Sequence, residues 1–306
     1  MEQSTSLKYI AHSAIDTEKW NRCIDESLNS RIYAYSWQLD RVVHSWDALV
    51  LGDYGYVMPL PIGKKLGIKY LFQPRFSQQL GIYPAPKPEI SNLFYRYLAD
   101  HFRFAEIQLN SGNLPGKNIE NLTFLPRKNY LLPLGNDYKS IASFYSNNTK
   151  RNIAKAQKNG LNIVEGIRLE TYLGFKAGNL APGVSRADIK TLKNIIAYSQ
   201  YKGFGEIYGV YSPGNQLCAA VYFCRWKDRV IYFNAASNEE GKNLGGMYFL
   251  LNHFIKQNAG KNLSLDFEGS MIPGVARFYA GFGATPETYF QLKINRLPSP
   301  FKWFKK

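Results

Sequence analysis

The sequence contains few of the residues that build metal centres and disulfide frameworks. Three cysteines and four histidines occur among its 306 residues. Cys23, Cys218 and Cys224 lack CxxC spacing, and the last two lie on one expected strand at a separation of about 20 Å, too far to share a metal. We therefore expect a protein of a reducing compartment, with no structural or catalytic metal.

Long apolar stretches and nucleotide-binding fingerprints are also missing. No segment approaches the roughly 20 apolar residues that span a bilayer, and residues 1–16 lack the apolar core of a signal peptide. We expect a cytoplasmic protein without a membrane span. The absence of GxxxxGK[ST] and GxGxxG argues against a P-loop or a Rossmann site.

Acidic residues are outnumbered. Thirty-eight Lys and Arg against 23 Asp and Glu give a formal net charge of +15, which favours encounter with coenzymes, nucleic acid or a membrane surface. A basic protein without an anionic partner remains an alternative. The hydrophobic content of 45% is that of a globular chain with one large or two medium domains.

The chain repeats one pattern of elements. Residues 46–110 and 205–268 each contain three strands joined by short turns, a polar loop, a helix with apolar residues every three or four positions, and a returning strand. The expected strands are 48–51, 56–61, 68–72 and 104–109 in the first half, and 206–211, 217–224, 229–236 and 263–269 in the second. This duplication predicts an α+β fold with two tandem domains, each a mostly antiparallel sheet flanked by helices.

We place the domain boundary after residue 136, so that the domains are residues 1–136 and 137–296, followed by a basic aromatic tail, 297–306. Further helices are expected at 15–28, 137–159 and 186–202, the last beginning at the capping box Ser185-x-x-Asp188. Residues 286–296 are expected to form one or two final strands.

A glycine pair opens the helix of the second half. Gly245 and Gly246 stand at its expected first turn, where unpaired amides and the helix dipole favour phosphate, and Lys242 would add charge. Glycines also open helices where the backbone must pass close to a sheet. The sequence leaves both interpretations open.

A basic helix precedes the second half. Arg151, Lys155 and Lys158 follow at i, i+4 and i+7 within "NNTKRNIAKAQKNG", which gathers three cations on one face, and Lys150 flanks them. Most charged faces are simply solvated. No acidic residue on this helix neutralises the cluster, so we interpret it as a candidate substrate-binding surface for anions.

Two carboxylates alternate with apolar residues near the end of a strand. Asp266 and Glu268 would share one face, and Tyr279 follows on the next helix. A carboxylate can take the proton of an amine and a tyrosine can protonate a leaving thiolate or ribose oxygen, although most tyrosines in so tyrosine-rich a chain have no such role.

The loop "QPRFSQQLG" of the first half is the fourth candidate. It crowds hydrogen-bond donors into one connection, which suits substrate binding but is equally typical of a surface loop. The candidate residues are Gln73, Arg75, Gln78 and Gln79.

The second half resembles the GNAT family of N-acetyltransferases. "VARFYAGFGA" is similar to the family's A-x-x-x-Y-x-x-x-G-F segment, which aligns Tyr279 with the usual general acid. The pyrophosphate pattern [QR]-x-x-G-x-[GA] falls on Lys242 to Met247, with other residues at its two ends. The resemblance implies that Lys242, Gly245, Gly246 and Met247 bind an acyl donor such as acetyl-CoA, with no tightly bound cofactor.

The tandem halves, "NTKRNIAKAQKNGL" and "DFEGS…ARFYAGFGA" resemble more specifically the FemABX-like branch. This resemblance implies acyl transfer to an amine of a small molecule or a peptidoglycan precursor, with Glu268 helping to deprotonate the amine and Tyr279 protonating the leaving group. Two alternatives remain: aminoacyl transfer from aminoacyl-tRNA, and a non-catalytic binder of RNA or an anionic glycan.

Overall fold

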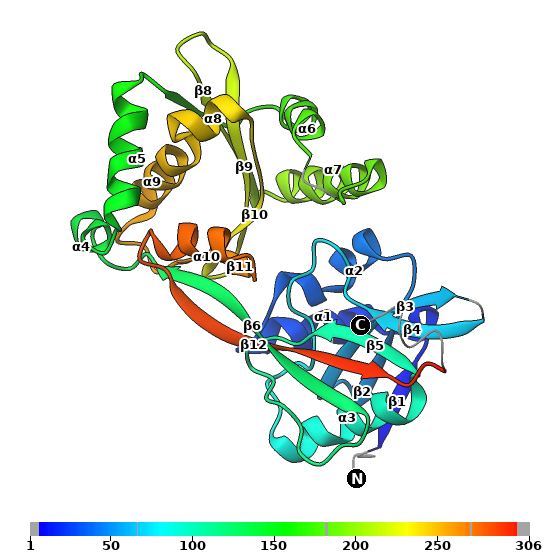
Figure 1. The fold of residues 1–306 in the computed structure, drawn as a ribbon. Coiled ribbons are helices and arrows are strands. Elements are labelled where there is room, and N and C mark those ends of the chain that lie inside the picture. Colours follow the sequence, from blue (N-terminus) through cyan, green and yellow to red (C-terminus); the bar gives the residue numbers. More distant parts are fainter. Residues whose placement is uncertain (1–5, 66, 181–182, 270, 299–306) are drawn as a thin grey trace. The chain divides into compact units, whose positions relative to one another are not determined.

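The computed structural model describes residues 6–65, 67–180, 183–269 and 271–298. They form two compact units: unit 1 runs up to Arg127 and resumes at Thr288, and unit 2 is Lys128–Glu287. Strand β6 (Leu122–Pro133) leads from unit 1 into unit 2, and β12 (Thr285–Asn295) leads back (Figure 1). The proposed boundary after residue 136 lies just past β6, and the expected tail from residue 299 onward lies outside the described residues.

Unit 1 is built on strands in the order β1-β2-β3-β4-β5-β12. The antiparallel run β1 to β4 is followed by β5, which pairs with β4 in parallel. Its elements are β1 (Leu7–Ile10), η1 (His12–Ala14), α1 (Thr17–Glu26), η2 (Ile32–Ala34), α2 (Ser36–Val42), β2 (Trp46–Leu51), β3 (Tyr56–Lys65), β4 (Ile68–Phe72), α3 (Pro88–His101) and β5 (Phe104–Gln108). Helix α3 buries Phe94 and Leu98 in the core of this unit.

Unit 2 has the strand order β6-β11-β10-β9-β8-β7. Its antiparallel run β7 to β10 is followed by β11, which pairs with β10 in parallel. Its elements are α4 (Tyr138–Ser143), α5 (Asn147–Lys158), β7 (Asn162–Glu165), α6 (Leu169–Gly178), α7 (Arg186–Tyr201), β8 (Gly205–Tyr211), β9 (Leu217–Trp226), β10 (Arg229–Ser237), α8 (Glu239–Leu244), α9 (Gly246–Asn258), β11 (Ser264–Gly269) and α10 (Pro273–Ala280).

The predicted duplication is confirmed. In each unit three antiparallel strands lead to a helix and then to a strand parallel to the third, as β2-β3-β4-α3-β5 and as β8-β9-β10-α9-β11. The expected helix 137–159 is two helices, because α4 ends before Ser146, whose Oγ caps α5 by accepting from the Thr149 amide at 3.1 Å. The predicted capping box of α7 is present. The sequence patterns missed β1, α2, β6, β7, α6 and α8.

Helices cover both faces of the unit 2 sheet. Figure 1 shows α5, α8 and α9 on one face, and α6 and α7 on the other. Helix α9 buries Leu250, Leu251 and Phe254, and the Phe254 ring stacks on Phe223 of β9 at 3.9 Å. Burial of each such side chain contributes about 1.5–3 kcal/mol to the packing of α9 on β8 to β10.

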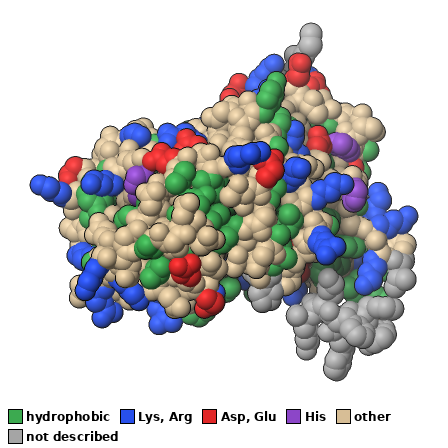
Figure 2. Space-filling model, turned by 90° about the horizontal axis from the view of Figure 1, so that it is seen from above, with side chains coloured by type: hydrophobic (Ala, Val, Ile, Leu, Met, Phe, Trp, Pro, Cys, Tyr) green, Lys and Arg blue, Asp and Glu red, His purple; other side chains and the backbone are tan. Residues whose placement is uncertain are grey.

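The basic side chains do not gather into one patch on the face shown in Figure 2. Lys and Arg side chains are distributed over the visible face, with Asp and Glu between them. None of the helices in the described part of the chain has the length and apolarity to cross a membrane.

Candidate active site

Strands β10 and β11 pair over a short stretch and then separate. They pair only through Arg229–Ile231 and Ser264–Asp266, although β10 continues to Ser237 and β11 to Gly269. A bulge in β10 between Tyr232 and Asn234 shifts its register on β9 at this point. Bulges bend a strand and interrupt its ladder, so a gap opens in the sheet where the two parallel strands would otherwise continue side by side.

The bulge also decides which backbone groups face the gap. The Asn238 amide donates to the Cys218 carbonyl of β9 at 3.1 Å. Residues of an antiparallel strand alternate between bonding their neighbour and facing away from it. In the register that follows the bulge, Ala235 therefore directs its amide and its carbonyl away from β9, toward the gap.

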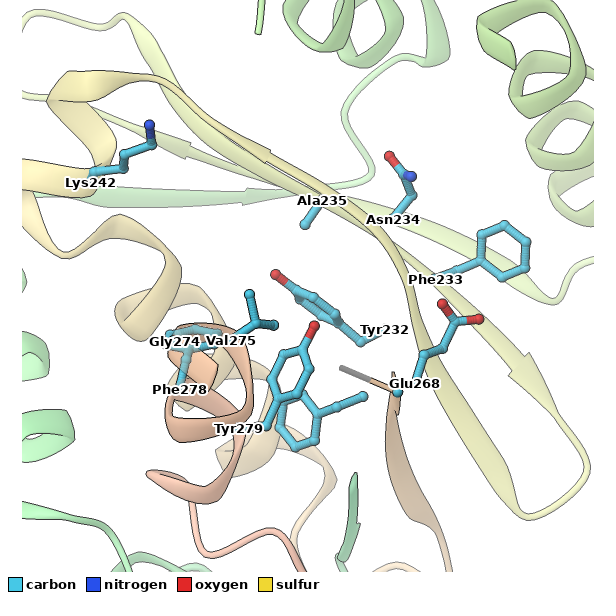
Figure 3. A pocket seen from close by; sticks show the side chains of 12 residues that line it. Tyr232, Phe233, Asn234, Ala235, Lys242, Glu268, Gly274, Val275, Phe278 and Tyr279 are labelled. Atoms are coloured by element: carbon cyan, nitrogen blue, oxygen red, sulfur yellow. The ribbon is translucent and has the colours of Figure 1, made fainter. Parts of the chain in front are cut away.

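A cavity of about 700 Å³ lies at the gap. It is lined by β10 (Tyr232, Phe233, Asn234, Ala235), α8 (Lys242), β11 (Phe267, Glu268, Gly269) and α10 (Gly274, Val275, Phe278, Tyr279). The structure therefore brings together three of the predicted site residues, Lys242, Glu268 and Tyr279, all within unit 2 (Figure 3).

Tyr279 packs between aromatic rings at this cavity. Its ring stacks on Phe267 at 4.8 Å and meets Tyr232 edge-on at 6.0 Å. Figure 3 shows the hydroxyls of Tyr232 and Tyr279 directed toward the same part of the cavity. Burial, together with the negative charges of Glu268 and Asp266, raises the pKa of Tyr279, so that its phenol stays protonated at neutral pH. A protonated phenol is the form that can donate to a leaving group.

Glu268 occupies a strained position on β11. Its φ of +58° lies in the left-handed region, and its amide donates to Asp266 Oδ1 at 2.9 Å, which holds the backbone in this conformation. Figure 3 shows its carboxylate beside Phe233, away from the Tyr279 hydroxyl. Asp266 does not line the cavity. It is 2% exposed and pairs with Arg229 at 2.8 Å.

The glycine pair lies at the junction of α8 and α9. Gly245 has φ +79°, and its amide donates to carbonyls of α8, Gly241 and Lys242, so it closes one helix while opening the next. A Cβ at Gly245 would lie 2.8 Å from the Asn152 carbonyl oxygen of α5. Close packing of α5 thus accounts for this glycine, and phosphate binding there remains a prediction. Gly245, Gly246 and Met247 are absent from the residues that line the described cavity.

Lys242 forms an ion pair, whereas Lys150 and Arg151 of α5 bond neutral oxygens. Lys242 pairs with Glu239 at 2.6 Å, which offsets the charge that it brings to the cavity. The side chains of Lys150, Arg151 and Lys155 are exposed on α5. Their hydrogen bonds within the described structure go to neutral oxygens, from Lys150 to the Ser143 carbonyl and from Arg151 to Asn148.

The polar loop of unit 1 is bonded largely to its own scaffold. Gln73 accepts from the Gln108 amide at 2.7 Å, and the buried Gln79 accepts from the Ser111 amide at 3.0 Å. Gln78 accepts from Gln79 at 3.2 Å, and Arg75 is exposed. Gln73 and Gln79 therefore stabilise the loop and the strand end beside it. Substrate binding by the four residues remains a prediction.

A second cavity adjoins the first. It measures about 640 Å³ and shares Gly274 and Phe278 with the cavity at the gap. Asn148 at the start of α5, Tyr248 of α9 and Arg277 of α10 contribute polar groups to it. Together the two cavities offer room for a ligand that extends past Phe278.

Sequence reasoning missed the residues that support β10 from the opposite face. Tyr172 of α6 donates to Asn234 Oδ1 at 2.8 Å and to the Asn234 carbonyl at 3.1 Å, and Lys176 donates to the Ala235 carbonyl at 2.7 Å. Nothing in the spacing of these residues signals this contact, because it depends on the bulge in β10. No group of three or more His, Cys, Asp or Glu that could hold a metal occurs within the described ranges.

Solved structures share this fold, whereas no family model and no curated protein matches the sequence. FemX aligns over 97% of this chain and 99% of its own at 11% identity, with a TM-score of 0.64. A tandem GNAT protein from the clavulanic acid biosynthesis pathway aligns over 96% and 100% at 12% identity, with a TM-score of 0.57. The C-terminal domain of a putative lysylphosphatidylglycerol synthetase from Agrobacterium fabrum aligns over 94% of both chains at 9% identity, with a TM-score of 0.56. The chain therefore has a GNAT-like fold of the FemABX type.

Proposed function

We propose that the protein is an N-acyltransferase that moves an acyl group from a phosphate-bearing donor to an amine, with unit 2 as its catalytic unit. The observation that carries this proposal is the gap between β10 and β11, with the Tyr279 hydroxyl and the Glu268 carboxylate directed to different sides of it. The fold of the structural relatives agrees with it. The acceptor is an amine of a small molecule or a peptidoglycan precursor, and the compartment is the cytoplasm.

The chemistry needs no covalent intermediate on the protein. The amine nitrogen attacks the acyl carbonyl, a C–N bond forms, and the C–S or C–O bond to the carrier breaks. Glu268 takes the proton of the amine, directly or through one water, and Tyr279 gives its proton to the departing sulfur or oxygen. Holding both reactants at one gap supplies proximity, and each proton transfer contributes about 10²–10⁴ in rate.

Acyl-CoA is the first donor to test, because its long, phosphate-ended carrier matches two adjoining cavities. We expect calorimetric titration with coenzyme A and acetyl-CoA at about 150 mM salt to show saturable micromolar binding. Gly274→Trp should abolish it, since Gly274 borders both cavities and a Cβ there meets no atom within 4 Å. Gly135→Trp is the matched control: that glycine is equally uncrowded and borders neither cavity. Absence of heat with wild-type protein would reject a coenzyme A donor.

Aminoacyl-tRNA is the second candidate donor. Helix α5 packs over the Gly245 turn, and its own exposed cations form a track for a polyanion. This arrangement favours a carrier whose phosphates lie along α5.

Neutralising that track gives a direct test. Changing Arg151, Lys155 and Lys158 to Gln should weaken tRNA binding about tenfold or more and lower the salt slope by about 2–3. The same change at Arg186, Lys190 and Lys193 of α7, three exposed cations with identical spacing, should have little effect. Equal losses from both triple variants would mean diffuse attraction to the whole surface. Transfer activity that survives ribonuclease would exclude this donor, and tRNA binding without transfer would favour the non-catalytic alternative.

A further inference from the structure

Lys176 is a buried cation beside the gap. Only 7% of the residue is exposed, and in the described structure no carboxylate pairs with it. A buried, unpaired ammonium is costly, so its hydrogen bonds must compensate for lost hydration. Burial correspondingly lowers the pKa of Lys176.

Among the described residues, the ammonium of Lys176 makes one hydrogen bond, and its acceptor belongs to β10. Lys176 Nζ donates to the Ala235 carbonyl at 2.7 Å, and Ala235 is a residue that faces the gap rather than β9. In a continuous sheet, an amide of β11 would bond that carbonyl. Because pairing with β11 ends at Ile231, the carbonyl would otherwise lack a strand partner.

Tyr172 acts one turn earlier on the same helix. It is fully buried, and its hydroxyl donates to both oxygens of Asn234, next to the bulge. Residues four apart lie on one face of a helix, so Tyr172 and Lys176 present two donors to two consecutive residues of β10. These three hydrogen bonds hold the part of β10 that lines the cavity.

We infer that Lys176, assisted by Tyr172, is a positioning residue of the acyl-transfer site that takes the place of β11 as the hydrogen-bond partner of β10 and so keeps the gap open in a fixed shape. This role rests on the proposed function insofar as the gap is the donor site. We expect its effect to be confined to residues 233–237, which distinguishes it from a role in the overall stability of unit 2. The Ala235 amide faces the gap beside the carbonyl that Lys176 bonds, so it is placed to donate a hydrogen bond to a ligand there.

Hydrogen exchange of the full-length, ligand-free protein tests the inference without any substrate. Lys176→Met keeps the apolar stem and removes the ammonium. It should accelerate exchange in residues 233–237 about tenfold while leaving β9 and α9 unchanged. Lys176→Arg, which retains a donor cation, should restore protection. Lys193→Met, an exposed lysine of α7, is the matched control and should match wild type.

Two results would overturn the inference. If the amides of residues 233–237 exchange at the same rate in Lys176→Met as in Lys193→Met, the ammonium does not hold β10. If amide exchange accelerates throughout unit 2, the substitution destabilises the whole unit. If Lys176→Met does not fold, Tyr172→Phe, which removes one hydroxyl, should still loosen residues 233–237, and unchanged exchange there would overturn the inference.

Coenzyme A titration of the same variants separates this inference from the proposed function. Weakening of about tenfold in Lys176→Met, with wild-type affinity in Lys193→Met, supports both. Wild-type protein that binds no coenzyme A, together with locally faster exchange in Lys176→Met, supports the positioning role and rejects only that donor.

Discussion

Replacing Tyr279 with Phe should lower the turnover of acyl transfer about 100-fold or more while leaving donor affinity nearly unchanged. The ring stays stacked on Phe267, so the variant loses only the hydroxyl that faces the cavity. A group that acts in the transition state affects kcat rather than ground-state binding. Steady-state kinetics with calorimetric donor titration measure both quantities.

The control for this variant is Tyr145→Phe. Tyr145 lies in the same core, and its buried hydroxyl has no hydrogen-bond partner in the described structure. Loss of that hydroxyl should leave turnover at the wild-type value. Because the pKa of Tyr279 is raised, the phenol does not ionise between about pH 6 and pH 9, and it should contribute no alkaline fall in rate over this range. Wild-type turnover in Tyr279→Phe would remove Tyr279 from the mechanism.

Replacing Asp266 with Asn should destabilise unit 2 by about 3 kcal/mol, since it leaves the Arg229 guanidinium without its buried partner. For a unit of this size the midpoint of thermal unfolding should fall by about 6–12 °C. Asp266 also accepts from the Glu268 amide, so the loss should extend to the geometry of the proposed base.

Glu239→Gln provides the comparison for Asp266→Asn. This variant breaks the ion pair between Glu239 and Lys242. The Glu239 side chain is 82% exposed and the Lys242 side chain 60%, so the free energy of unfolding should change by no more than about 0.5 kcal/mol. Thermal and denaturant unfolding measure both variants. Equal, small effects would mean that the Asp266 pair adds little to the fold.

Local patterns indicated candidate residues only where a few neighbouring positions decide the outcome. The motif of α10 indicated Tyr279, which lines the cavity. Alternation along β11 placed Asp266 and Glu268 on one face, but the left-handed backbone at Glu268 breaks this alternation, so Phe267 and Glu268 line the cavity and Asp266 does not. The turn at Gly245 and Gly246 was harder, since what surrounds it depends on α5, far away in the sequence. The contact of Lys176 with β10 depends on a bulge that changes register by one residue, and a one-residue shift leaves no trace in the apolar pattern.

The two-sided gap in the sheet has a consequence for the order of events in catalysis. The Tyr279 hydroxyl and the Glu268 carboxylate are directed to different sides of the gap. An acyl carrier on the Tyr279 side and an amine on the Glu268 side would therefore occupy different parts of the site. Both would be bound when the bond forms, and the kinetic scheme would be a ternary complex rather than a ping-pong exchange.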